Sequence, residues 1–478
     1  MNNLKFFRLY LSRLSRRYYQ KLVNSSKDFS FKRLAIGTVY IFFILLVFVV
    51  IFLFWRRNQV SVTCPSISEG IVGAYDNSNL PSSVTALLSD SLFQLDKTGS
   101  PAARLVENIS SNQENTEFNL TLKKNLVWND GVKVKSSDIK INLPDIEVNY
   151  PDDSTIHFKL ADSFSPFLSL LTTPVLKPNS LIGLGKYKVS FQEINRGHIS
   201  KLVLEPTDKK SCDVNPYVSI RFYQDEQTIK TAFNLGEIDA ILAISDLNDF
   251  TKQPNVVVKK IQSFNKLTAI FYNFKDTILD KNYRKALNYS INPIENEDKA
   301  KTSIPQISWA YNTDLKEIHG DTASAKTFLA KVETGKDKPV TLTTSPYLAN
   351  LAQKIVEDWK KVGINAVIRT ESGNPQNFQA LLTTVSIPRD PDQYALWHST
   401  QANTNLSKYS SPRVDKDLED GRKIGDTEKR KEKYFDFQKV LQDDAPASFL
   451  YFPKINVVYR QKAESNLNKI LPTQITQY

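Results

Sequence analysis

The stretch LKKNLVWNDGVKV, at residues 122–134, is the most informative part of this 478-residue sequence for the fold. It follows FNLTL at 118–122, where apolar and polar residues alternate as they do in a half-buried strand. Asp130-Gly131 then provides turn chemistry, because glycine adopts backbone angles that other residues avoid. Trp128 adds a large apolar side chain that needs a core to cover it. The stretch therefore predicts a strand and a tight turn in a folded domain.

Strand-like and helix-like segments alternate on both sides of this stretch. Strands are expected at 70–75, 118–122, 155–160, 201–204, 218–223, 267–273, 340–343 and 366–369. Helices are expected at 82–92, 226–235, 281–290, 322–331, 348–362 and 428–442, with Gly236 as a C-cap. Mixed elements over about 400 residues predict an α/β architecture with more than one lobe.

Short motifs follow one another along the chain in a particular order. They are SDSLFQLD (89–96) with RLVEN (104–108), LKKNLVWNDGVKV with SDI (137–139), GKY (185–187), GEIDA (236–240), FYN (271–273) with YRKAL (283–287), VGI (362–364), Asp390-Pro391-Asp392 and Asp444-Ala445-Pro446. Each motif alone is weak, because it mainly builds turns and helix ends. Together they resemble family 5 of the extracellular solute-binding proteins, which serve peptide and nickel ABC importers. The resemblance covers roughly residues 70–460.

The resemblance implies an α/β fold of two lobes, a clamshell of the periplasmic-binding-protein type (class II), with strands that cross between the lobes. The first crossing is expected near 262–274 and the return near 385–402. One departure from the family lies between Asp138 and Leu143, where relatives continue into a long helix and a small extra subdomain. Here a strand pair near 147–160 follows directly, so we expect a compact member with that subdomain largely deleted.

The resemblance also places a ligand between the lobes, near the crossing strands. The expected ligand contacts follow the first strand, the first helix of the second lobe and the Asp-Pro-Asp turn: Tyr75, Asp76, Asn77, Trp309, Tyr311, Asp392, Tyr394, Trp397, His398 and Ser399. Several of these residues also allow a second interpretation, in which they do not contact a ligand. Tyr75 and Trp397 are equally suited to a core, and His398 suits a surface or the edge of a cleft. Asp390 either faces the cleft or only shapes its turn.

Peptide binders of this family place an aspartate four residues before the turn proline, where it pairs with the amino terminus of the peptide. The corresponding residue here is Ile387, and Pro388 replaces the usual neighbouring aromatic residue. The ion pair is therefore not supplied from the expected position. Asp76 and Asp392 are the candidate substitutes.

A second informative stretch lies near the N-terminus, where residues 34–55 read LAIGTVYIFFILLVFVVIFLFW without a charge. As a helix it spans about 33 Å, enough for the ~30 Å hydrocarbon core of a bilayer. A cleaved signal peptide has a shorter apolar region that ends in small residues, and Phe54-Trp55-Arg56-Arg57 offers none. We therefore expect one uncleaved transmembrane helix before the clamshell.

The net charge of +11 is concentrated around this apolar stretch. Residues 1–57 contain eleven Lys and Arg and one acid, Asp28, so the remainder is close to neutral. Such a remainder does not attract polyanions, and no nucleic-acid partner is expected. Nine bases precede the apolar run and two follow it, which places the N-terminus in the cytoplasm and the large domain outside the cell.

The expected organisation follows from these observations. It comprises a basic cytoplasmic tail (1–33), the transmembrane helix (34–55), a stem (56–68), the first part of lobe I (69–262), lobe II (263–400) and the C-terminal part of lobe I (401–478).

Two cysteines and four histidines lie far apart, and their spacing predicts no metal site. Cys64 and Cys212 face an oxidising compartment, where an isolated pair tends to be bridged. In the family fold the strands that follow them belong to one lobe, so a disulfide is expected. Two unrelated thiols are the alternative.

The resemblance implies a membrane-tethered protein that captures a peptide or another small solute and delivers it to ABC permease subunits. A sensor or structural ectodomain of the same fold, without transport, is the alternative. The sequence contains no nucleophile motif or zinc-protease motif, so neither an enzyme nor a cofactor is expected.

Overall fold

The computed structural model describes residues 64–333, 335, 337–373 and 375–475. The expected basic tail, the expected transmembrane helix at 34–55 and most of the expected stem lie outside these residues. Within the described ranges, no helix has both the length and the apolar character needed to cross a membrane.

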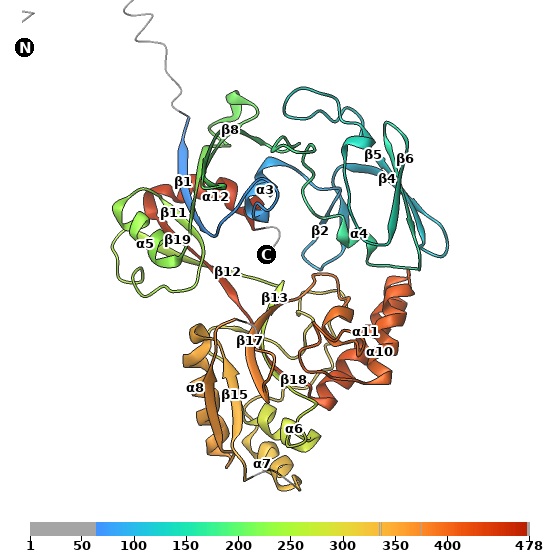
Figure 1. Cartoon of the computed structure of the whole chain (residues 1–478), viewed down its shortest axis with the longest axis vertical. Coiled ribbons are helices and arrows are strands. Elements are labelled where there is room, and N and C mark those ends of the chain that lie inside the picture. Colours follow the sequence, from blue (N-terminus) through green and yellow to red (C-terminus); the bar gives the residue numbers. More distant parts are fainter. Residues whose placement is uncertain (1–63, 334, 336, 374, 476–478) are drawn as a thin grey trace, which may run out of the picture. The chain divides into compact units, whose positions relative to one another are not determined.

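Lobe I is built on a seven-stranded sheet with the order β12-β19-β11-β1-β10-β9-β8 (Figure 1). Its strands are β1 (Ser66–Val72), β8 (Tyr187–Asn195), β9 (His198–Pro206), β10 (Tyr217–Tyr223), β11 (Ala240–Ile244), β12 (Val256–Gln262) and β19 (Lys454–Arg460). Helices α3 (Ser82–Leu88) and α12 (Glu464–Gln474) pack on one face, and α5 (Glu226–Leu235) packs on the other. Gly236 caps α5 with a φ of 81°, as predicted.

Lobe II is built on a six-stranded sheet with the order β14-β18-β13-β17-β15-β16. Its strands are β13 (Lys266–Tyr272), β14 (Asp298–Lys299), β15 (Val340–Thr344), β16 (Ala366–Thr370), β17 (Ala380–Ser386) and β18 (Ala447–Phe452). Helices α6 (Lys281–Ser290), α7 (Thr322–Ala330) and α8 (Ala349–Lys361) pack on one face. Helices α9 (Tyr394–Trp397), α10 (Pro412–Lys423) and α11 (Thr427–Asp444) pack on the other.

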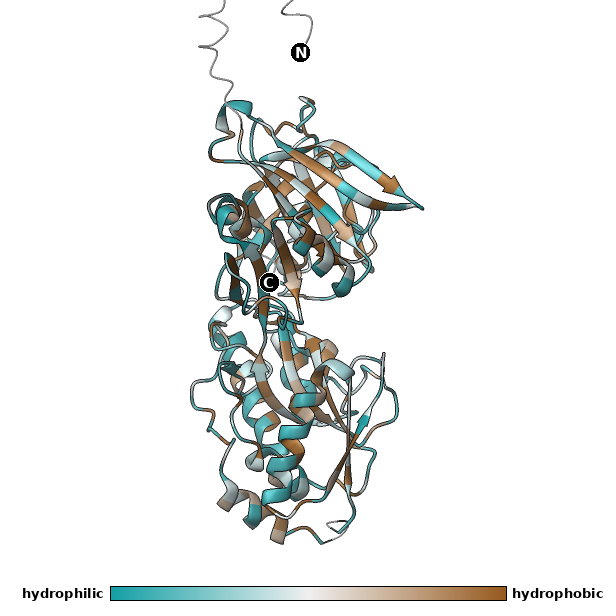
Figure 2. Ribbon diagram, turned by 90° about the vertical axis from the view of Figure 1, so that its left-hand side faces the viewer, coloured by the Kyte–Doolittle hydropathy of each residue, from teal (hydrophilic) through white to brown (hydrophobic). Residues whose placement is uncertain are grey.

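Strand β13 shows why this second sheet is covered on both faces. Successive side chains of a strand point to opposite faces, and here both sets are apolar. Ile270 and Tyr272 join the core under α6 and α8, whereas Leu267 and Phe271 join the core under α9 to α11. Figure 2 shows the same pattern: strands carry hydrophobic stretches, and the helices mix hydrophilic and hydrophobic residues.

The chain crosses twice between the two sheets. β12 ends in the first sheet at Gln262 and β13 begins in the second at Lys266, so the first crossing lies where it was predicted. The return occurs at Pro453, between β18 of the second sheet and β19 of the first. The prediction of a return near 385–402 is therefore wrong.

Residues 401–452 consequently belong to lobe II, and not to the C-terminal part of lobe I. After β17 the chain forms α9 to α11 on the second sheet, where Tyr434, Phe437 and Leu441 enter the core. The Asp-Pro-Asp turn leads into these helices and does not lead back to the first sheet. Helical periodicity marks the buried side of a helix but does not say which sheet covers it.

The stretch at 122–134 lies in a small subdomain with its own four-stranded sheet, ordered β4-β5-β7-β6. These strands are β4 (Val106–Ser111), β5 (Glu117–Leu122), β6 (Ile146–Asp152) and β7 (Thr155–Leu160), beside the hairpin of β2 (Phe93–Leu95) and β3 (Pro101–Ala103) and the short helix α4 (Phe167–Leu170). Trp128 is 1% exposed in its core. As predicted, no long helix lies between Asp138 and β6, and the strand pair expected near 147–160 follows directly as β6 and β7. These two strands complete the four-stranded sheet with β4 and β5, which precede Asp138 in the chain.

Cys64 and Cys212 form a disulfide, with their Cα atoms 5.3 Å apart. The parallel pairing of β1 with β10 explains this proximity, because Ser66 lies opposite Tyr217 and both cysteines precede these strands. The bridge ties the start of the described chain to the sheet of lobe I.

Candidate functional site

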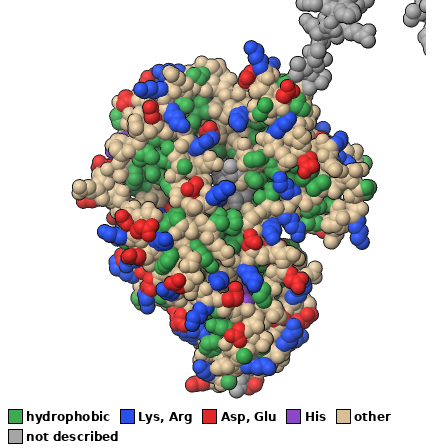
Figure 3. Space-filling model, turned by 180° about the vertical axis from the view of Figure 1, so that it is seen from behind, with side chains coloured by type: hydrophobic (Ala, Val, Ile, Leu, Met, Phe, Trp, Pro, Cys, Tyr) green, Lys and Arg blue, Asp and Glu red, His purple; other side chains and the backbone are tan. Residues whose placement is uncertain are grey.

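A groove with a volume of about 480 Å³ lies between the two lobes at the crossing strands. Seen from behind, the surface is indented between the lobes, and Lys and Arg side chains border the indentation (Figure 3). Lobe I and the crossings contribute Ala243, Ile244, Ser245, Leu247, Lys260, Ser263, Pro453, Lys454, Ile455 and Asn456. Lobe II contributes Lys266, Thr268, Glu297, Tyr347, Leu348, Thr384 and Tyr451. Because both lobes line the groove, a change in their relative orientation changes its width.

The floor of the groove on the lobe II side is fixed by strand pairing. β13 and β17 are antiparallel, and Thr268 lies directly opposite Thr384. Their hydroxyl oxygens are 2.9 Å apart, so one hydroxyl donates to the other. Tyr451 lies beside them, and burial raises the pKa of its phenol. These hydroxyl groups supply polar contacts at fixed positions on the lobe II side of the groove.

On the lobe I side, the groove begins where β11 ends. A β-bulge between Ile241 and Ile244 interrupts the pairing of β11 with β19, and Ala243 adopts a φ of 59°. An alanine rarely occupies this left-handed region, and such backbone is concentrated at functional sites. β1 and β10 run parallel to β11, so their carboxyl ends lie at the same edge of the sheet. Ligand sites in α/β proteins commonly lie at this edge.

Four charged side chains line the groove: Glu297, Lys260, Lys266 and Lys454. Burial raises the pKa of Glu297, while the positive charges of Lys454 and Lys260 oppose this shift. The Lys454 ammonium also donates a hydrogen bond to the carbonyl of Asn296. The groove therefore combines one carboxylate with three ammonium groups.

None of the ten residues predicted as ligand contacts lines this groove. Tyr75 follows β1 at the expected edge, but its ring packs on Phe222 and its hydroxyl donates to the Val72 carbonyl at 3.0 Å. Asp76 accepts hydrogen bonds from the amide and hydroxyl of Ser78, and these bonds lower its pKa.

The other predicted contacts of lobe I and the α6–α7 connection also have structural partners. Asn77 accepts a hydrogen bond of 2.8 Å from the Gln192 amide. Trp309 packs on Tyr434 at the surface that faces the β2–β3 hairpin, and its amide donates to the Thr98 carbonyl at 3.2 Å. Tyr311 is half-buried against the core beneath α11.

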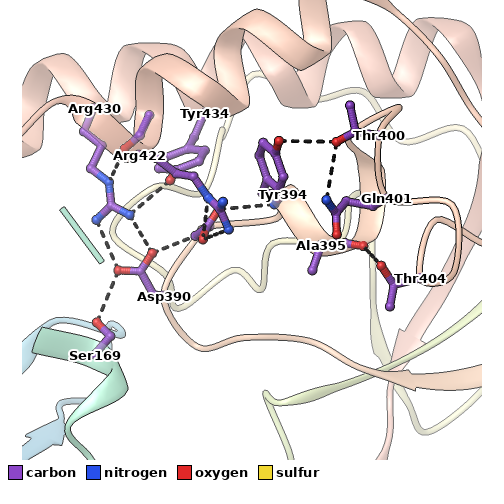
Figure 4. A network of polar contacts seen from close by, with 12 residues as sticks. Ser169, Asp390, Tyr394, Ala395, Thr400, Gln401, Thr404, Arg422, Arg430 and Tyr434 are labelled. Atoms are coloured by element: carbon purple, nitrogen blue, oxygen red, sulfur yellow. Dashed lines mark hydrogen bonds and ion pairs between the residues drawn. The ribbon is translucent and has the colours of Figure 1, made fainter. Parts of the chain in front are cut away.

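The residues after the Asp-Pro-Asp turn hold this part of lobe II together (Figure 4). Asp392 accepts hydrogen bonds of 2.9 and 3.0 Å from the Arg422 guanidinium. That guanidinium lies 3.8 Å from the centre of the Tyr394 ring, whose other neighbour is the stacked imidazole of His398. The Asp392 carboxylate is therefore paired with an arginine within lobe II.

The last three predicted contacts also have partners within lobe II. Trp397 is 1% exposed and stacks on Phe271, which confirms its second interpretation as a core residue. His398 is buried and contacts Glu419 at 3.2 Å. Ser399 donates to Asp415 at 2.6 Å. In the described part of the chain, no group of three or more His, Cys, Asp or Glu side chains is arranged to hold a metal ion.

The residues that line the groove were not predicted from the sequence, although the position of the first crossing indicated two of them. Ser263 and Lys266 flank the first crossing, whose position was predicted correctly. Glu297, Thr384 and Tyr451 have no local motif that marks them. They meet because β14, which Glu297 precedes, and the strands β18, β13 and β17 are successive neighbours in one sheet.

Two lobes with separate sheets, two crossing strands and a groove between them define a two-lobed solute-binding fold. A family model described as bacterial extracellular solute-binding proteins, family 5 Middle, matches residues 100–406. The chain belongs to this family.

Individual relatives agree with this assignment. The oligopeptide-binding protein AppA of Bacillus subtilis is 26% identical over 330 residues, which are 59% of this chain and 59% of AppA. The chain thus spans about three fifths of the length of that curated relative. Among solved structures, Campylobacter jejuni NikZ in complex with Ni(L-His) is similar with a TM-score of 0.66 and 21% identity, over 84% of this chain and 95% of NikZ.

A second solved structure, the ABC transporter substrate binding protein CtaP of Listeria monocytogenes, is similar with a TM-score of 0.70 and 19% identity. The similarity covers 83% of this chain and 94% of CtaP. At these identities the likeness to both structures concerns the fold. It supports the two-lobed architecture and does not specify the solute.

Proposed function

We propose that this chain is a membrane-tethered extracellular solute-binding protein that captures a peptide-like solute and delivers it to an ABC importer. The observation that carries the proposal is the groove, which is lined from both lobes where the two strands cross. A solute in this groove contacts both lobes, so its binding energy favours the closed arrangement.

Family membership supports binding and not catalysis as the activity. The name of the Bacillus subtilis relative supports a peptide-like solute, and the nickel–histidine complex bound by the Campylobacter jejuni protein is the nearest alternative. The apolar segment at 34–55 supports tethering through one helix, with the N-terminus in the cytoplasm and the domain outside the cell. The Cys64–Cys212 bridge supports the same topology, because disulfides persist in oxidising compartments.

The test is a ligand screen on the full-length chain in detergent. Mixtures of short peptides, Ni²⁺ with L-histidine, and sugars are added separately, and the thermal midpoint is followed. A ligand at a hundred times its Kd stabilises the bound state by about 2.7 kcal/mol, which shifts the midpoint by several degrees. A shift with the peptide mixtures supports the proposal. A shift with none of the mixtures contradicts the binding role.

A further inference from the structure

Glu297 is the one acidic residue that lines the groove within the described ranges. It directly precedes β14, whose pairing with β18 places Asp298 opposite Phe452, next to the second crossing. The preceding residue, Asn296, turns the chain with a φ of 62°, and its carbonyl accepts a hydrogen bond from Lys454 of lobe I. The backbone around Glu297 is therefore held by contacts from both lobes.

One carboxylate oxygen of Glu297, Oε2, is buried and has no hydrogen-bond donor among the described residues. A buried polar atom without a partner is unfavourable, and among the residues that line the groove in the described part of the chain Glu297 alone carries one. Burial also raises the pKa of this carboxyl group, as expected when donors are too few. A ligand that brings an N–H donor into the groove removes this deficit.

The aspartates considered as substitutes for the missing anchor are occupied elsewhere. Position 387 carries a buried isoleucine. Asp76 accepts hydrogen bonds within its own turn, and Asp392 is paired with Arg422. Glu297 is thus the carboxylate that the groove itself provides for a cationic group.

Lys260 and Lys266 provide the opposite charge. Lys260 lies on β12 of lobe I and Lys266 begins β13 of lobe II, so one lysine stands on each side of the first crossing. Both side chains are exposed, and neither has a hydrogen bond or a short ion pair to any residue that the structure describes. An anionic group between them contacts both lobes at once and therefore favours closure.

We infer that the solute of this groove is zwitterionic, with its ammonium group at Glu297 and its carboxylate between Lys260 and Lys266. This inference rests on the proposed solute-binding function and names the chemistry of the ligand: a short peptide or amino acid with both ends free. Tyr347 is 64% exposed beside the groove and offers an aromatic surface to a side chain of the ligand.

The test compares three random tripeptide libraries on the full-length chain in detergent, with binding measured by native mass spectrometry and by competition. One library has free ends, one is N-acetylated and one is C-amidated. Acetylation removes the ammonium group and amidation removes the carboxylate. Each loss is expected to weaken binding about tenfold or more, the usual effect of a lost charge-assisted hydrogen bond.

Variants assign each end of the ligand to its residue. Glu297→Gln should abolish the preference for a free amino end and keep the preference for a free carboxyl end. Lys266→Gln should weaken only the preference for a free carboxyl end. Glu295→Gln and Lys252→Gln are matched controls, because both residues are exposed and lie outside the groove. The preference is a ratio measured on one protein, so it stays interpretable when a variant lowers stability.

The outcomes test two claims separately: the assignment of the charged groups and the proposed solute-binding function. Equal binding of the acetylated and free libraries, or an unchanged preference in Glu297→Gln, overturns the assignment while the solute-binding function stands. Binding of uncharged sugars alone overturns it in the same way. If no library and no other solute binds, the proposed function fails and the assignment fails with it.

Discussion

Arg430 and Asp390 form a buried ion pair in lobe II, with guanidinium nitrogens 2.6 and 3.1 Å from the two carboxylate oxygens (Figure 4). Both side chains are less than one tenth exposed. The pair joins α11 to the Asp-Pro-Asp turn, and the hydroxyl of Ser169, from the subdomain, reaches the same carboxylate at 3.3 Å. The turn motif thus fixes the contact between lobe II and the subdomain, so Asp390 does more than shape its own turn.

Replacing Arg430 with methionine leaves the Asp390 carboxylate buried without its counter-charge. Removing one partner of a buried pair typically lowers the free energy of unfolding by about 3–5 kcal/mol. Urea unfolding of the full-length chain, followed by tryptophan fluorescence, measures the change. Arg104→Met is the matched control, because the Arg104–Asp90 pair is about half exposed and its loss should change stability by less than ~1 kcal/mol. Equal effects of the two variants would contradict the importance of the buried pair.

Glu69 makes the stability of lobe I depend on pH. Its carboxylate is fully buried beside α12, and burial raises its pKa from 4.5 to about 7, despite a hydrogen bond of 2.7 Å from Gln474. The folded state therefore binds the proton more tightly than the unfolded state does. The contribution of Glu69 to the free energy of unfolding is fully present below about pH 4.5 and is lost as the pH rises to about 7.

We therefore expect Glu69→Gln to be more stable than the wild type at pH 8, on the order of 3 kcal/mol, and similar to it at pH 4.5. Urea unfolding at both pH values measures the difference. Glu464→Gln, at an exposed residue that begins the same helix, is the control and should keep the pH dependence of the wild type. An unchanged pH dependence in Glu69→Gln would exclude this residue as its cause.

The disulfide should stabilise the chain through its unfolded state. Cys64 and Cys212 are 148 residues apart in the sequence, and the chain-entropy model gives about 4 to 5 kcal/mol for a loop of this size. The Cys64→Ser/Cys212→Ser double variant should lose stability of that order in urea unfolding. Thiol titration of the wild type, denatured without reductant, should detect no free thiol. Two free thiols would show that the bridge does not form.

The expected topology predicts a simple result in intact cells. Nine bases precede the apolar run at 34–55 and two follow it, so residues 56–478 should lie outside the cytoplasmic membrane. Protease added to cells with a permeable outer envelope should remove most of the mass of the chain and leave an N-terminal fragment. A cytoplasmic protein serves as the lysis control. Full protection of the chain would contradict this orientation.

The sequence by itself determined the family and several of the elements, although it predicted none of β17, β18 and α10. The strand, turn and tryptophan of 122–134 depend on residues next to one another, and so does the cap at Gly236, so local rules predicted them. The first crossing was expected from the resemblance to the family, and it lies between the end of β12 at Gln262 and the start of β13 at Lys266. The disulfide followed from the family fold, since β1 and β10 are neighbours in its first sheet.

Only the tertiary structure decided where residues 401–452 belong and which side chains line the groove. The helices after the Asp-Pro-Asp turn are amphipathic, and an apolar helix face packs on whichever sheet the topology brings near it. The same limit applies to the site. Glu297, Thr384 and Tyr451 lie far apart in the chain and meet through strand pairing, whereas Tyr394, Trp397 and His398 follow a conspicuous turn yet serve the interior of lobe II. Contacts between distant segments depend on strand order, which the local sequence pattern does not encode.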